Sequence, residues 1–83
     1  MFGTEKKIER FLKIKMRHSD GPFEVVVTLT EDVPMEGWSS VTSLGLYGVV
    51  PKLFGRLTGD QIRRLAGADW VELIEARRAL TAV

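Results

Sequence analysis

The residues that could carry chemistry are few and lie far apart in the chain. Among 83 residues there is one histidine, His18, and no cysteine, which leaves little from which to build a transition-metal site. The serine cluster is Ser39, Ser40 and Ser43, but a serine nucleophile needs an adjacent base. His18 precedes the core of the domain, and we interpret it as an exposed loop residue. The sequence therefore predicts neither a catalytic nucleophile nor a metal site.

Acidic side chains also fail to form a convincing acid–base pair. Glu31 lies next to Asp32, and Glu72 lies three residues before Glu75. We interpret these pairs as helix-start and strand-edge charges, because negative charge is favourable at the start of a helix. The segment Gly45–Gly48 is too short for a dinucleotide-binding loop and precedes a strand instead of a helix. We therefore expect no enzyme activity and no cofactor.

Composition narrows the class of protein further. Twelve basic and eleven acidic side chains give a formal charge of +1, which is too balanced to predict nucleic-acid binding. No apolar run is long enough to span a membrane or to form the core of a secretory signal. The absence of cysteine fits a reducing compartment. We expect a single small cytoplasmic domain.

The chain opens with a predicted amphipathic helix. Ile8, Phe11 and Leu12 follow the i, i+3, i+4 spacing of a helix face, and Thr4 is a suitable N-cap for a helix over residues 4–17. Ile14 falls on the polar side. Gly21 and Pro22 then disfavour helix. We assign residues 1–21 to an N-terminal helix and linker, and residues 22–83 to the domain that follows.

Residues 23–29, FEVVVTL, are β-branched and almost continuously apolar, which predicts a central strand covered on both faces. A helix should begin near residue 34. Its buried face is predicted to consist of Met35, Trp38 and Val41. Gly37 should weaken this helix, because glycine has a low helix propensity.

Residues 46–50 and 53–57 indicate two short strands that form a hairpin around Pro51 and Lys52. Thr58 and Gln61 have the spacing of a capping box at the start of a second helix, with Ile62, Leu65 and Ala66 as its buried stripe. The last strand is predicted over residues 71–75. The order β-α-β-β-α-β predicts an α+β fold of the ferredoxin-like type, an antiparallel four-stranded sheet with two helices on one face, preceded by the N-terminal helix.

The run LFGRLTGDQIRRLAGADWVELIEARRAL resembles the C-terminal half of subtilisin-type propeptides and their free-standing inhibitor relatives. The shared pattern is a strand, a helix capped by threonine or serine with Gln or an acid at its third position, a turn, and V-x-x-[IV]-E. Here this last motif is Val71 to Glu75. The earlier PFEVVVTL resembles the first strand of the family, so the resemblance covers residues 22–83.

The resemblance implies a subtilisin-like serine protease as the partner, with this chain as inhibitor or folding chaperone. The open sheet face would pack on two surface helices of the enzyme, and Glu75 would cap the N-terminus of an enzyme helix. The chain end would enter the substrate cleft as an added strand. The tail residues so implied are Leu80, Thr81, Ala82 and Val83, with Val83 in the primary specificity position and Leu80 in an apolar pocket. Arg77 stands where the family often has a second acid.

Two other functions are compatible with the same fold. The first is a non-inhibitory interaction module that associates with itself or with another partner through strand edges or the N-terminal helix. The second, RNA binding on the open face, requires aromatic residues on central strands, and only Phe23 and Phe54 are candidates. We expect the N-terminal helix to dock on its own sheet, Trp70 to be partly exposed while it covers the core, and Trp38 to be buried.

Overall fold

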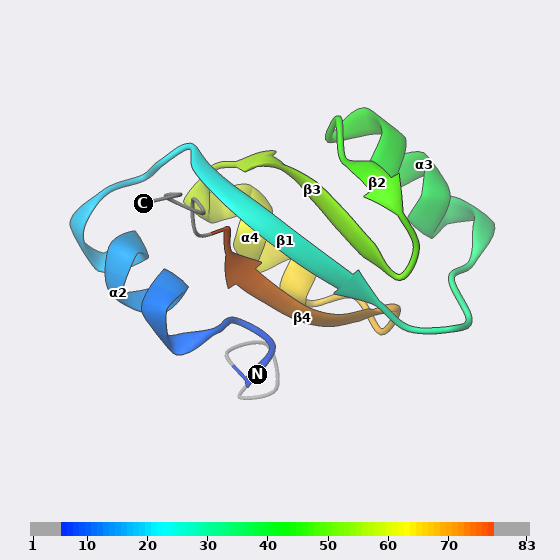
Figure 1. The fold of residues 1–83 in the computed structure, drawn as a ribbon, viewed down its shortest axis with the longest axis horizontal. Helices are drawn as coiled ribbons and strands as arrows, with labels where there is room; N and C mark the ends of the chain where they lie inside the picture. Colours follow the sequence, from blue (N-terminus) through cyan, green and yellow to red (C-terminus); the bar gives the residue numbers. More distant parts are fainter. Residues whose placement is uncertain (1–5, 78–83) are drawn as a thin grey trace, which may run out of the picture.

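The computed structural model describes residues 6–77, which form an α+β domain with one four-stranded antiparallel sheet (Figure 1). The strand order is β2-β3-β1-β4, and the order of elements along the chain is β-α-β-β-α-β after an initial helix. The predicted ferredoxin-like fold is thus confirmed. The elements are α2 (Arg10–His18), β1 (Phe23–Leu29), α3 (Met35–Ser43), β2 (Tyr47–Val49), β3 (Lys52–Leu57), α4 (Gly59–Ala66) and β4 (Val71–Ala76).

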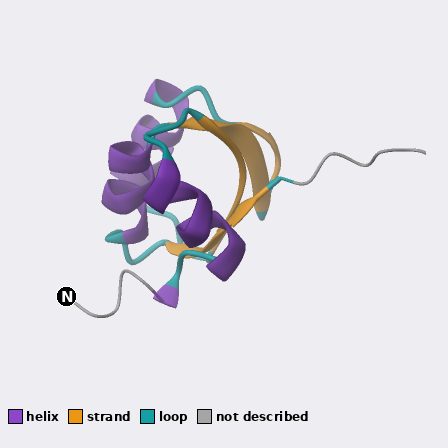
Figure 2. Cartoon of the chain, turned by 90° about the vertical axis from the view of Figure 1, so that its left-hand side faces the viewer, coloured by secondary structure: helices purple, strands orange, loops and turns teal. Residues whose placement is uncertain are grey.

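Strand β1 lies at the centre of the sheet and pairs with β3 on one side and β4 on the other. Its side chains alternate, so that Val25, Val27 and Leu29 are buried. The expectation that both faces of this strand are covered is wrong, because Val26 is only half-buried and Glu24 is exposed. The cause is that the helices of the described chain all lie on the concave side of the sheet (Figure 2).

The core fills the space between the sheet and these helices. Its largest fully buried side chains are Leu12, Leu57, Ile62, Ile74, Val25, Val27 and Val71. Helix α4 contributes the predicted stripe of Ile62, Leu65 and Ala66, and it begins with the predicted capping box. In this box the Gln61 amide donates to the Thr58 hydroxyl at 3.3 Å, while the Thr58 amide donates to Gln61 Oε1 at 2.8 Å. Two backbone donors at the helix start are thereby satisfied.

The prediction of one helix from Thr4 onward is wrong over residues 7–9. Thr4 lies outside the described residues, but Lys7 lies in a turn, Ile8 forms a parallel bridge with Ile74 at the outer edge of β4, and Glu9 is extended. The Ile74 amide donates to the Lys7 carbonyl at 2.7 Å, and the Glu9 amide donates to the Ile74 carbonyl at 2.9 Å. These bonds satisfy an edge that would otherwise be unpaired, and this is the physical reason the segment leaves the helical path. We call Lys7–Glu9 the N-terminal arm.

Helix α2 therefore starts later than predicted, at Arg10. Glu9 caps it, because Glu9 Oε2 accepts a hydrogen bond from the Phe11 amide at 2.9 Å. The expectation that this helix docks on its own domain is confirmed, since Leu12 is fully buried in the core and Met16 packs against it. Ile14 is exposed, as predicted. Docking occurs on the side of α4, so the opposite face of the sheet stays uncovered (Figure 2).

Helix α3 turns a different face to the core than the sequence predicts. Val41 is buried, but Met35 is 83% exposed and Trp38 is 38% exposed, so the predicted burial of these two residues is wrong. Gly37 is buried in their place. The ring of Trp70, itself partly buried as expected, lies against Gly37: a Cβ atom there would come within 3.0 Å of Trp70 Cε2 and 2.8 Å of Val33 Cγ1. Close approach to the indole thus fixes the rotation of the helix.

The predicted hairpin is confirmed, but its turn is Val50–Pro51 and not Pro51–Lys52, because Lys52 already pairs in β3. Tyr47 pairs with Phe54, and Val49 pairs with Lys52. Strand β2 has only three residues and forms the second edge of the sheet. Across residues 6–77, no helix is long and apolar enough to cross a membrane.

Candidate protein-binding face

The uncovered side of the sheet, which we call the open face, is the candidate binding surface of the described chain. The strand register places its side chains in rows, since residues paired across antiparallel strands point to the same side. Glu24 is next to Arg56, Val26 lies between Phe54 and Glu75, and Thr28 lies between Lys52 and Leu73. Tyr47 and Val49 extend two of these rows onto β2. Arg77 follows directly after β4.

An apolar strip runs across the open face. Tyr47 is 59% exposed and Val49 is 82% exposed, while Val26, Phe54 and Leu73 are half-buried. The helices cover none of these side chains. A strip of this kind, with charged residues around it, is typical of a protein-binding surface.

The Arg77 side chain stacks on Phe54 and is hydrogen-bonded to Tyr47 on the open face. The Arg77 amide donates to the Glu24 carbonyl at 2.8 Å, which continues the pairing of the sheet beyond β4. Its guanidinium lies 4.8 Å from the centre of the Phe54 ring, and Nη1 donates to the Tyr47 hydroxyl at 3.4 Å. The two rings are tilted by 41° with their centres 6.2 Å apart. These contacts join the end of β4 to β2 and β3 and hold the cation over the ring face.

Two hollows flank the Arg77 side chain. One, of about 680 Å³, is lined by Glu9, Val26, Lys52, Phe54, Glu75, Ala76 and Arg77. The other, of about 510 Å³, is lined by Glu24, Gly45, Tyr47, Gly55, Arg56 and Arg77. Each contains both a cationic and an anionic side chain. They can accept polar groups of a partner on either side of the stacked guanidinium.

The charged groups of the open face are not paired with one another. Three cations, Lys52, Arg56 and Arg77, share this face with Glu24 and Glu75. The salt bridge found among residues 6–77 lies elsewhere, between Arg63 and Asp60 on helix α4 at 3.5 Å. Charges on the open face therefore remain available to a partner.

Of the site residues predicted from the sequence, Glu75 lies on the open face, partly buried beside Val26. Leu80, Thr81, Ala82 and Val83 lie outside the described residues. The sequence analysis missed Tyr47 and the Arg77 stack. Phe54 was identified as an aromatic residue on a strand, but alternation within residues 46–57 is the signal that could have placed Tyr47 and Phe54 on one face.

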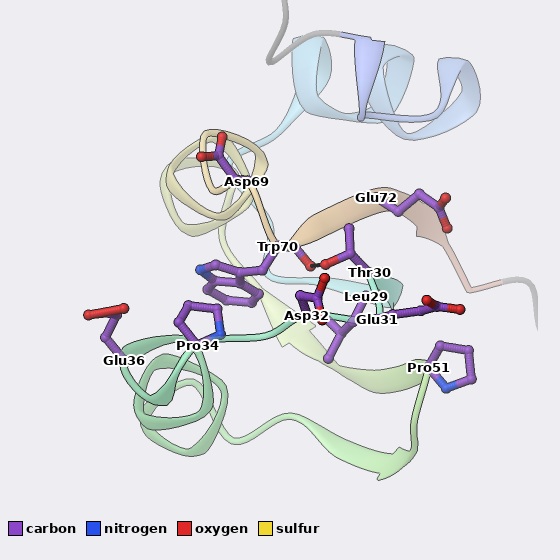
Figure 3. A pocket seen from close by; sticks show the side chains of 10 residues that line it. All are labelled: Leu29, Thr30, Glu31, Asp32, Pro34, Glu36, Pro51, Asp69, Trp70 and Glu72. Carbon is purple, nitrogen blue, oxygen red and sulfur yellow. Dashed lines mark hydrogen bonds between the residues drawn. The ribbon is translucent and has the colours of Figure 1, made fainter.

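A hollow of about 1060 Å³ lies at the end of the sheet near Pro51 and Trp70 (Figure 3). Its acidic residues are Glu31, Asp32, Glu36, Asp69 and Glu72. Figure 3 shows that their carboxylates point in different directions and not toward one centre. Within the described part of the chain, no three such side chains are arranged to hold a metal ion. Glu72 lines this hollow and Glu75 lines another, so the two do not form a pair.

The serine cluster lines a groove of about 490 Å³ between α3 and α4. Ser39, Ser40 and Ser43 share it with Gln61, Arg64, Trp70 and three apolar residues, Leu44, Leu65 and Ala68. Among the described residues that line the groove there is no histidine or carboxylate to act as a base. His18 is exposed, as predicted, but it is the last residue of α2 and not a loop residue.

Comparison with known proteins assigns no function to these surfaces. The open face is therefore characterised by its own geometry: an apolar strip, a carboxylate at Glu75 without a salt bridge among residues 6–77, and a guanidinium stacked on Phe54 and hydrogen-bonded to Tyr47. No protein-family model matches this chain, and no curated protein matches it.

Proposed function

We propose that this protein is a propeptide-like domain that binds a subtilisin-type serine protease, as an inhibitor or a folding chaperone. The open face of the sheet docks on the surface of the enzyme, and Leu80–Val83 occupies the substrate cleft in the manner of a cleaved product. The sequence resemblance over residues 22–83 supplies the kind of partner. The uncovered apolar strip is the observation that carries the proposal.

The position of helix α2 supports this function. A helix docked across the open face would block any partner at that surface. Helix α2 instead packs beside α4, with Leu12 in the core, and leaves Tyr47 and Val49 exposed. Because the strip is already accessible, docking requires no prior displacement of the helix.

Glu75 has a suitable environment for contacting a partner. Its carboxylate lines the hollow beside Arg77 and makes no salt bridge within residues 6–77. The positive end of a helix dipole on the enzyme would stabilise such a carboxylate. Two residues later, Arg77 lies on the open face, where its amide donates to the Glu24 carbonyl.

The test is inhibition of a panel of subtilisin-type proteases by the full chain and by a chain that ends at Ala79. We expect the full chain to inhibit at least one protease as a competitive inhibitor. Removal of residues 80–83 should raise the inhibition constant by about 100-fold or more, since each anchored side chain in a cleft contributes on the order of 1–2 kcal/mol. Equal inhibition by both chains would contradict the role of the tail.

Docking of the open face is tested separately with a matched pair of exposed apolar residues. Tyr47→Ala removes a ring from the open face and should weaken inhibition about tenfold. Met35→Ala, on the outer side of α3, should leave it unchanged, because Met35 is 83% exposed on the opposite side of the molecule. Equal effects of the two substitutions would exclude the open face as the docking surface.

The second candidate function is self-association at the edge of β2. The N-terminal arm covers the edge of β4, but in the described chain no strand pairs with the outer side of β2. Val49 and Val50 are exposed there. Light scattering of the full chain and of a Val49→Lys variant addresses this function: a dimer that the substitution converts to a monomer would support it.

A further inference from the structure

One corner of the open face has a more specific chemistry than the rest of the surface. We call Tyr47, Arg56 and Arg77 the basic corner; they line the same hollow of about 510 Å³. We propose that the basic corner binds a carboxylate side chain of the partner protein. The inference rests on the proposed function for the identity of the partner, but its chemistry rests on the geometry of the corner alone.

Arg77 is held ready for such a contact. Stacking on Phe54 at 4.8 Å and the hydrogen bond to Tyr47 already restrain its side chain, so less conformational entropy is lost when a ligand binds. A guanidinium carries five N–H donors, and only one of them is directed at Tyr47. The remaining donors can form the forked pair of hydrogen bonds that a carboxylate prefers.

Tyr47 and Arg56 complete the arrangement. The Tyr47 hydroxyl accepts a hydrogen bond from Arg77, so its own proton can be donated to a carboxylate oxygen. Arg56 brings a second cation to the same hollow. Glu24, the cross-strand neighbour of Arg56, also lines the hollow, and its charge opposes an incoming anion. Removal of the Glu24 charge should therefore strengthen binding.

The corner fits a single carboxylate side chain better than a nucleic acid. The repeated charges of a phosphate backbone would meet both carboxylates of the open face, Glu24 and Glu75, whereas one carboxylate at the corner meets Glu24 alone. Single-stranded nucleic acids are bound by stacking of bases on accessible rings. One face of the Phe54 ring is covered by Arg77, so that face does not offer a base such a platform.

The experiment is an NMR titration of the ¹⁵N-labelled full chain with an acetylated, amidated peptide of six glutamates. The matched peptide of six glutamines is the control. We expect saturable shifts of the Arg56 and Arg77 Nε–Hε signals and of the Tyr47 amide with the glutamate peptide only. Glu24→Gln should tighten binding and Arg77→Glu should weaken it, each by about two- to fivefold, as for exposed ion pairs. Arg64→Glu, the same charge reversal on α4, should change nothing.

Helix α2 is an internal control for non-specific attraction of the glutamate peptide to positive charge. It contains no acidic residue and four cations, Arg10, Lys13, Lys15 and Arg17. Larger shifts on α2 than at the basic corner would overturn the inference, as would equal binding of the two peptides. Tighter binding of a decauridine RNA at the corner would assign it to nucleic acid instead.

The outcome is separable from that of the proposed function. If the chain inhibits no protease but binds the glutamate peptide at the basic corner, the carboxylate site stands. The proposal that the partner is a protease is then contradicted. If the chain inhibits a protease and Arg77→Glu leaves the inhibition constant unchanged against every protease of the panel, the proposed function stands. The proposal of a carboxylate site is then contradicted.

Discussion

At Gly37, helix α3 approaches the indole ring of Trp70 so closely that no side chain fits between them. A Cβ atom would meet Val33 Cγ1 at 2.8 Å and two ring atoms of Trp70 at 3.0 and 3.1 Å. We expect Gly37→Ala to destabilise the fold by about 1–2 kcal/mol, because overpacking outweighs the gain in helix propensity of roughly 0.5–1 kcal/mol. Urea unfolding followed by tryptophan fluorescence measures this difference.

Ser39→Ala is the matched control for this prediction, since Ser39 is exposed on the same helix. It should leave stability unchanged or raise it by a few tenths of a kcal/mol, roughly the difference in helix propensity. Equal stabilisation by both substitutions would show that α3 can move away from Trp70 without cost.

The N-terminal arm and α2 contribute buried side chains and edge pairing to the stability of the fold. Ile8 and Leu12 are 6% and 0% exposed in the common core, and the arm pairs with β4. A chain that starts at Gly21 loses both side chains, each worth about 1.5–3 kcal/mol, and uncovers the edge of β4. The summed loss of burial free energy approaches the whole free energy of unfolding of a small domain. We expect this chain to lose its cooperative thermal transition and to associate through the exposed edge.

Circular dichroism melting and light scattering measure these two effects. Substitution of Lys13 by alanine, on the outer part of α2, should preserve the transition. A chain starting at Gly21 that remains a monomer with an unchanged midpoint would mean that α2 and the arm add nothing to the core.

Local sequence signals identified the elements that are encoded by their own residues, and missed features that depend on distant contacts. The β-branched run of β1 and the Thr58 capping box lie within the elements that they specify, so both were predictable. The spacing of Ile8 and Leu12 suits a helix equally well, and only the edge of β4 makes Ile8 extended. Gly37 has no hydrophobic side chain that could reveal its burial against Trp70. Glu75 was found by resemblance, whereas the Arg77 stack depends on side chains from three strands.

Across the whole molecule, the free energy of local unfolding should differ from one element to another. Strand β1 pairs on both sides and buries Val25, Val27 and Leu29, while α3 buries only Gly37 and Val41. Elements with fewer buried apolar side chains open at lower free energy. We expect native-state hydrogen exchange to show α3 amides opening before those of β1, at a free energy lower by about 1–3 kcal/mol. Equal protection of the two elements would instead make them one cooperative unit.

The carboxylate of Glu9 joins the two extremities of the described chain. One oxygen accepts from the Phe11 amide at the start of α2, and the other accepts from the Ala76 amide at 3.2 Å, at the end of β4. Together with the backbone bonds between the N-terminal arm and Ile74, this carboxylate couples the end of β4 to the start of α2. A fluorophore attached on α2 would therefore report a displacement of the end of β4.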